Sequence, residues 1–193
     1  MAERAVASVN GHAQGVRGAL DRLYQVSAAL AALCLAAIAG LVVIQVTGRS
    51  LGVLVPGADD LAGYALMAST FLGLAPTLRA GAHIRVTLLL SHAPPARKRR
   101  LELWCLAVGA AVCAYVCWYV VEMAKDAWRF GEKSTGNLPV PLWIPESVMA
   151  LGIAILTIAF IDDFVRVLSG EAPSYPDDAA TVEDAAVVAD GEG

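Results

Sequence analysis

Charge is scarce in this chain: Asp, Glu, Lys and Arg together make up only 17% of its 193 residues, whereas hydrophobic residues make up 58%. No charged residue occurs in the stretches 23–48, 61–78, 103–121 and 147–161. A soluble bundle would need polar helices to cover segments that are apolar all round, and the chain has none. Each stretch can form about 20 residues of helix, the length that crosses a bilayer core. The sequence therefore predicts an all-α integral membrane protein with four transmembrane helices.

We place the spans at about 24–47, 59–79, 101–124 and 142–165, within a transmembrane domain of residues 24–168. The fourth span reaches Leu142 only by including one carboxylate, Glu146. The first is too long for the apolar region of a signal peptide, which has about 7 to 15 residues. Leu33 also stands before Cys34, where a lipoprotein-type cleavage site needs a small residue. We expect this span to stay in the membrane, preceded by a cytoplasmic segment, residues 1–23.

Basic residues are missing from the C-terminal end. The last 23 residues hold seven acidic residues and no Lys or Arg, with few large apolar side chains. Such a segment cannot bury enough surface to order itself. We therefore predict that residues 169–193 form a disordered cytoplasmic tail, whose role the sequence leaves open.

The chemical groups that redox or metal centres need are also lacking in the predicted spans. All four cysteines lie in spans, but no two form a C-x-x-C motif, and the three histidines lie outside the spans where haem ligands would be expected. An internal repeat or a charge near mid-membrane would indicate a substrate pathway, and the sequence has neither. We predict no catalytic, cofactor or metal site, and we expect the chain not to be an enzyme. The cysteines concerned are Cys34, Cys105, Cys113 and Cys117; the histidines are His12, His83 and His92.

The orientation follows from the positive charges. Six of the 14 Lys and Arg residues lie in residues 79–100, including the run Arg97, Lys98, Arg99 and Arg100. Burying that run would cost on the order of 10 kcal/mol, and basic residues in short loops stay cytoplasmic. With both termini on the same side, ten Lys and Arg residues are cytoplasmic and four are outside. The sequence predicts an N-in, C-in topology.

The connection between the second and third spans contains a short apolar run, 84–91, with the sequence "IRVTLLLS". It is too short to cross the bilayer and too apolar to lie in water. We predict an interfacial segment whose apolar side chains face the acyl boundary, with Arg85 and the following basic run at anionic headgroups. His83 is a candidate polar contact beside it. The "APP" at 93–95 would end any helix there.

At the outer side, the predicted third helix continues beyond its span. Glu122 with Lys125, and Asp126 with Arg129, form i,i+3 pairs that support a helix in water up to Gly131. Residues 131–143 then form an irregular outer loop, in which Ser134 and Pro141 are candidate partner contacts. Tryptophan rings settle at membrane interfaces, and so Trp128 and Trp143 join the candidates. Asp59 and Asp60 begin the second span, where N-capping and a partner contact both remain open.

Rows of small residues at helical spacing indicate close helix packing, because lipid offers no hydrophobic drive to replace such contacts. An Ala-rich chain produces some of these rows by chance, so they indicate association without naming the pairs. The rows are Ala28, Ala32, Ala36 and Gly40; Ala65, Ser69 and Gly73; and Gly109, Cys113 and Cys117.

Several of these segments occur in an order that is similar to a known family. They are the acidic pair 59–60, "FLG" at 71–73, "GAHIRV" at 81–86, "PPARKRR" at 94–100 and "GEKSTGNLPVPLW" at 131–143. Over about residues 24–168 the chain resembles the small membrane subunit of tripartite ATP-independent periplasmic (TRAP) transporters, the DctQ family. Family members commonly have an acidic residue where this chain has Thr87, so that carboxylate's role does not carry over.

The resemblance implies a non-catalytic scaffold subunit in the bacterial inner membrane. In that family the small subunit binds a large membrane subunit, which carries the substrate by an elevator-type motion driven by a sodium gradient, and a periplasmic binding protein delivers the substrate. The substrates are typically organic acids. The expected partners are thus the large subunit, the binding protein and anionic membrane lipids, with no nucleic acid.

Two other functions remain as alternatives. A self-sufficient small transporter or channel, assembled as an oligomer, would need a polar stripe along its pore, for which Gln45, Thr47 and Thr70 are the scattered candidates. A membrane redox enzyme would need its thiols and a bound chromophore.

Overall fold

The computed structural model describes residues 2–80 and 95–170, and within them the side chains of residues 17–80 and 99–170. The elements are α1 (Ala2–Ser50), α2 (Ala58–Arg79), α4 (Pro95–Phe130) and α5 (Trp143–Leu168). Each of the four is long and apolar enough to cross a membrane. These ranges contain no β-strand, only one isolated bridge, and the predicted all-α, four-helix architecture is confirmed. The predicted interfacial segment and most of the predicted tail lie outside the described residues.

Two helices are longer than the spans predicted for them. α1 begins at Ala2, so most of the segment predicted to precede the first span is helical. α4 begins at Pro95, one of the residues predicted to end any helix there. A proline is compatible with the first turn of a helix, because its missing N–H would have no intrahelical partner. At its other end α4 continues to Phe130 and stops before Gly131, which has φ 64°. That ending is the one predicted from the sequence, since glycine adopts the left-handed conformation that follows many helices.

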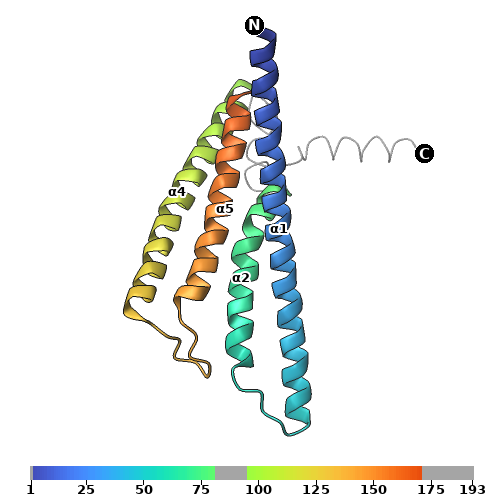
Figure 1. Ribbon diagram of the computed structural model, residues 1–193, viewed down its shortest axis with the longest axis vertical. Helices are drawn as coiled ribbons and strands as arrows, with labels where there is room; N and C mark the ends of the chain where they lie inside the picture. The colour runs from blue at the N-terminus through green and yellow to red at the C-terminus, as the bar shows by residue number, and fades with distance from the viewer. Residues whose placement is uncertain (1, 81–94, 171–193) are drawn as a thin grey trace, which may run out of the picture.

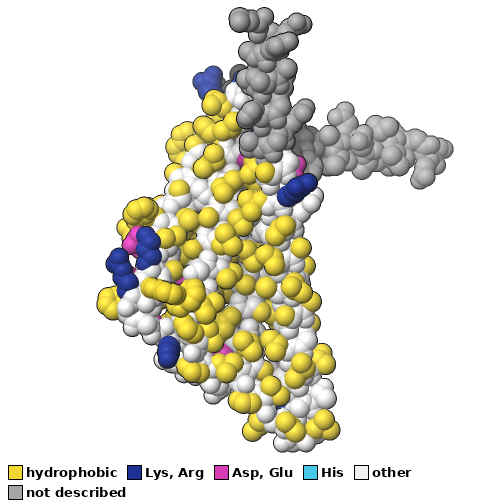
Figure 2. All heavy atoms as spheres, viewed as in Figure 1, with side chains coloured by type: hydrophobic (Ala, Val, Ile, Leu, Met, Phe, Trp, Pro, Cys, Tyr) yellow, Lys and Arg dark blue, Asp and Glu magenta, His cyan; other side chains and the backbone are white. Residues whose placement is uncertain are grey.

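The helices form a row, in which α1 packs on α2, α2 on α5 and α5 on α4 (Figure 1). α1 and α5 meet only slightly. We call the two ends of the row the Arg79 end and the Asp60 end. These residues are 19 positions apart on α2, about 28 Å of helix, which is close to the thickness of a bilayer core. Among the described residues no further element covers either broad face of the row, and Figure 2 shows hydrophobic side chains across all four helices on one of these faces.

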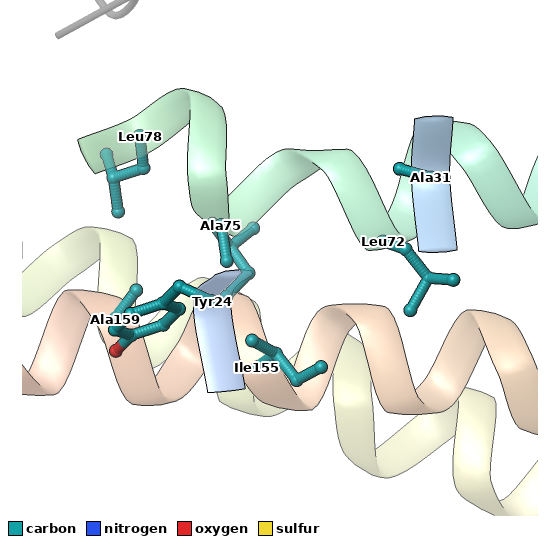
Figure 3. Close-up of a cluster of buried hydrophobic side chains, with 8 residues drawn as sticks. Tyr24, Ala31, Leu72, Ala75, Leu78, Ile155 and Ala159 are labelled. Carbon is teal, nitrogen blue, oxygen red and sulfur yellow. The ribbon is translucent and has the colours of Figure 1, made fainter. Parts of the chain in front are cut away.

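A cluster of buried hydrophobic side chains joins α1, α2 and α5, the first three helices of the row. Ala75 is fully buried, and the hydroxyl of Ser27 donates a 2.5 Å hydrogen bond to the carbonyl oxygen of Leu72, which ties α1 to α2. In Figure 3 the ring of Tyr24 lies beside Ala159 of α5. The cluster thus brings α1 against α5 at the Arg79 end. Its members are Tyr24, Ala31, Leu72, Ala75, Leu78, Ile155, Leu156 and Ala159.

Small residues set the closest approaches between helices. A Cβ on Gly152 of α5 would lie 2.6 Å from the backbone carbonyl of Phe71 on α2, and one on Gly109 of α4 would lie 2.8 Å from the Phe160 ring. A side chain on Gly152 would force the two backbones apart, whereas one on Gly109 would require the Phe160 ring to move. The predicted row on α4 therefore faces α5, and Ser69 and Gly73 of the α2 row lie in its packed side.

The predicted row on α1 has a different position. Ala32, Ala36 and Gly40 are exposed, whereas α1 packs through Tyr24, Ser27 and Ala31 on another face. Apart from Ala28, which is half-buried, the α1 row therefore lies outside the helix contacts that the structure describes.

Candidate functional site

Contacts between charged side chains and neighbouring elements gather at the two ends of the row. At the Arg79 end, the last residue of α2 joins three helices. The Nη1 atom of Arg79 lies 2.5 Å from an Asp21 oxygen on α1, and its Nη2 atom lies 3.9 Å from an Asp162 oxygen on α5. The guanidinium carbon also stands 4.5 Å from the centre of the Tyr24 ring. Cation–π attraction and ion pairing thus act on one side chain.

This Arg79 cluster is largely screened from solvent on the α5 side. The side chains of Arg79 and Asp162 are 21% and 16% exposed, and Asp162 also accepts a 3.2 Å hydrogen bond from Arg166. The adjacent Asp163 is 1% exposed. Ion pairs with this little exposure gain more from Coulomb attraction than surface pairs do, and losing one partner costs more.

Arg99 belongs to the basic run that the sequence assigned to lipid or partner contacts. Its Nη2 atom donates hydrogen bonds to the carbonyl oxygens of Val167 at 3.3 Å and Leu168 at 3.1 Å. These carbonyls belong to the last turn of α5, where they carry partial negative charge, and that of Val167 also accepts a 3.2 Å hydrogen bond from the N–H of Gly170. Arg99 therefore fastens α4 to α5. Arg100 is exposed, and the side chains of Arg97 and Lys98 lie outside the described residues.

At the Asp60 end, both aspartates of the acidic pair have partners within the chain. Asp59 accepts a 2.6 Å hydrogen bond from Gln45 of α1, and Asp60 accepts a 3.1 Å hydrogen bond from the backbone N–H of Leu138. The N-cap of α2 is Gly57, with φ 79° and no side-chain cap bond. The capping interpretation is therefore wrong for both side chains, although their place in the first turn suits the helix dipole.

Asp60 holds the loop between α4 and α5, residues 131–142, against the start of α2. The loop is folded on itself: the N–H of Ser134 bonds to the carbonyl of Val140 at 2.9 Å, and Lys133 pairs with Pro141 in an isolated β-bridge. The Leu138 side chain packs on Gly57, where no Cβ would fit. Candidate residues Ser134 and Pro141 are half-buried in this loop.

Replacing Asp60 with alanine should release the loop. The carboxylate hydrogen bond to Leu138 contributes about 1.5 to 3 kcal/mol in comparable settings, so local opening should become at least about tenfold more frequent. Hydrogen exchange of residues 132–142 in the purified protein measures this. Asp126→Ala is the matched control, because Asp126 is exposed at the same end and forms no ion pair with any described residue. Equal exchange in the two variants would contradict the assignment.

Trp128 of α4 and Trp143 of α5 meet edge to face, with ring centres 4.7 Å apart. The predicted pair Glu122 and Lys125 forms with a separation of 2.8 Å, whereas Arg129 makes no ion pair with any residue that the structure describes. Trp128 and Trp143 thus pack together at the junction between α4 and α5, at the level of the charged residues 122–129 of α4.

These contacts position helices and present no reactive group. Across residues 17–80 and 99–170, no three His, Cys, Asp or Glu side chains are placed to hold a metal ion. The four cysteines are free thiols inside helices. Candidates His83 and Arg85 lie outside the described residues.

Sequence reasoning missed the Arg79 cluster. In the sequence Arg79 is only one of the basic residues of the stretch 79–100, and nothing distinguishes Asp162. The sequence does place opposite charges at the same predicted membrane surface on three spans, but nothing in it says that the first, second and fourth spans are neighbours.

The fold and these contacts define a multi-pass α-helical membrane protein whose polar residues serve helix assembly. A family model described as "Tripartite ATP-independent periplasmic transporters, DctQ component" matches residues 38–170, more than half of the chain. The chain therefore belongs to the DctQ family, the small component of TRAP transporters. That family works with a large membrane subunit and a periplasmic binding protein, and it is not known as an enzyme family. A comparison with curated proteins gives no match.

Proposed function

We propose that this chain is the scaffold subunit of a TRAP transporter that imports an organic acid across the bacterial inner membrane, driven by a sodium gradient. It carries neither the substrate site nor the ion site. The large membrane subunit holds both, and it packs against one broad face of the helix row. The periplasmic binding protein delivers the substrate.

The observation that best supports this proposal is where the charges lie. On α2, α4 and α5 the residues between Asp60 and Arg79, Glu102 and Glu122, and Glu146 and Asp162 include no charged side chain. At the ends, Arg79 and Arg99 join one helix to another and Asp60 joins α2 to the loop before α5, while Glu122 with Lys125 and Asp162 with Arg166 pair within one helix. A carrier for an anion and sodium ions would need polar groups at mid-membrane, where this chain offers packing instead.

In the proposed topology the Arg79 end lies at the cytoplasm and the Asp60 end at the periplasm. The basic run of residues 97–100 then meets the cytoplasmic leaflet, as the positive-inside rule requires. The loop held by Asp60 faces the periplasm, where it can contact the binding protein. Ser134 and Pro141 are the candidate contacts in that loop.

The alternative of a small oligomeric channel gains no support from its candidate polar residues. The Gln45 amide donates to Asp59, and the Thr70 hydroxyl donates a 2.8 Å hydrogen bond to the carbonyl of Leu66 in its own helix. Two of the three candidates thus have their donors engaged inside this chain.

Coexpression with the large subunit tests the proposal. We expect the tagged chain to copurify with that subunit in mild detergent, and substrate uptake in vesicles to need both proteins together with the binding protein and a sodium gradient. A large subunit that purifies alone and transports at full rate would contradict the scaffold role.

A further inference from the structure

An open groove of about 340 Å³ lies between α4 and α5 at the Asp60 end. Its floor is apolar and its rim carries two positive charges and two indole rings. The groove is lined by Val121, Ala124, Lys125, Trp128 and Arg129 of α4 and by Trp143, Ser147 and Ala150 of α5.

The two cations of the rim are well placed to bind one anion together. Lys125 and Arg129 are four residues apart, so they project from the same face of α4 one turn from each other. Both are exposed. Lys125 also forms an ion pair with Glu122, whereas Arg129 makes no ion pair in the described part of the chain. No carboxylate lines the groove. Glu122 compensates the charge of Lys125 from outside the lining, so the uncompensated positive charge of the rim is that of Arg129.

The depth of the groove matches the boundary between headgroups and hydrocarbon. The charge-free part of α4 lies between Glu102 and Glu122, about 30 Å of helix, which spans a bilayer core. Lys125 and Arg129 come just beyond it, and Val121 and Ala124 reach back toward it. The Trp128 and Trp143 rings mark the same level, because indoles settle at the membrane interface.

We propose that this groove binds an anionic phospholipid from the leaflet at the Asp60 end. The phosphate lies between Lys125 and Arg129, where the guanidinium of Arg129 can form paired hydrogen bonds with two phosphate oxygens. One acyl chain runs along Val121, Ala124 and Ala150 into the bilayer. An acidic protein surface would satisfy the cations but would not fill an apolar floor that opens toward hydrocarbon.

Native mass spectrometry of the full chain, loaded with phosphatidylglycerol or with phosphatidylcholine, tests this site. We expect one phosphatidylglycerol molecule to be retained in preference to phosphatidylcholine. The double variant Lys125→Gln/Arg129→Gln should bind it about tenfold more weakly, because each basic residue contributes to attraction at the membrane surface. The matched control is Arg49→Gln/Lys133→Gln. It removes two exposed positive charges from the same end of the row but outside the groove, and should retain the lipid as the unaltered protein does.

A second variant separates the groove from general charge attraction. Ala124→Trp fills the floor while both cations remain, and it should also lose the phosphatidylglycerol. Unchanged thermal unfolding shows that each variant is folded, which the exposed positions of Lys125 and Arg129 favour. Equal retention of the two lipids, equal loss in the control, or a Lys125→Gln/Arg129→Gln variant that keeps the lipid but loses a copurifying protein would each overturn the proposal. None of these outcomes depends on the proposed scaffold function.

Discussion

Arg79→Ala should lower the free energy of unfolding by about 2 kcal/mol, between the values for exposed and buried ion pairs. The substitution removes the partner of Asp21, one of the two partners of Asp162, and the cation over the Tyr24 ring. Asp162 keeps Arg166, so the loss stays below that of a fully buried pair. A thiol-reactive dye can follow unfolding in detergent, because the chain has four free cysteines inside its helices.

Arg49→Ala is the control for this prediction. Arg49 is an exposed arginine at the other end of the row and forms no ion pair within the described residues. The free energy of unfolding of Arg79→Lys should lie between those of the two alanine variants, since lysine keeps the charge but not the forked geometry of the guanidinium. Identical stabilities for the Arg79→Ala and Arg49→Ala variants would mean that the Arg79 cluster does not hold α1, α2 and α5 together.

Gly152→Ala should destabilise the protein by about 1 to 3 kcal/mol, the usual cost of overpacking. The added Cβ would lie 2.6 Å from the backbone of Phe71, and a backbone atom cannot move aside as a side chain can. α2 and α5 would have to separate, and they form the central junction of the row. The variant should therefore also copurify less of the large subunit.

The same substitution at another helical glycine provides the comparison. A Cβ on Gly63 of α2 would have no atom within 4 Å, so Gly63→Ala adds a methyl group to open space. We expect it to be neutral or slightly stabilising, because alanine favours helix over glycine by about 1 kcal/mol. If the two variants unfold alike, the close crossing of α2 and α5 is not a determinant of stability.

The four apolar helices could be predicted from the sequence because lipid imposes a length and an absence of charge that are visible in the residues. α2 and α5 differ from their predicted bounds by at most three residues at either end. The bounds of α1 and α4 differ more from the predicted ones, because outside the hydrocarbon no such rule fixes where a helix begins or ends. The end of α4 was predictable because paired charges and Gly131 give local signals.

The neighbours of each helix could not be predicted. Alanine occurs on several faces of α1, so Ala31 inside the cluster and Ala32 outside it look alike in the sequence. Arg79 and Asp21 are 58 positions apart, and only the packing of α1 on α2 brings them together. Asp60 illustrates the same limit: its first-turn position suggested a local cap, whereas its actual partner, Leu138, is 78 positions away.

The central claim is that this chain supports a carrier and does not itself move a solute. Uptake by vesicles that contain this chain alone, with the binding protein and an inward sodium gradient supplied, tests it most directly. The account predicts no uptake above that of empty vesicles, and uptake only when the large subunit is added. Sodium-dependent accumulation of an organic acid by vesicles with this chain alone would contradict it.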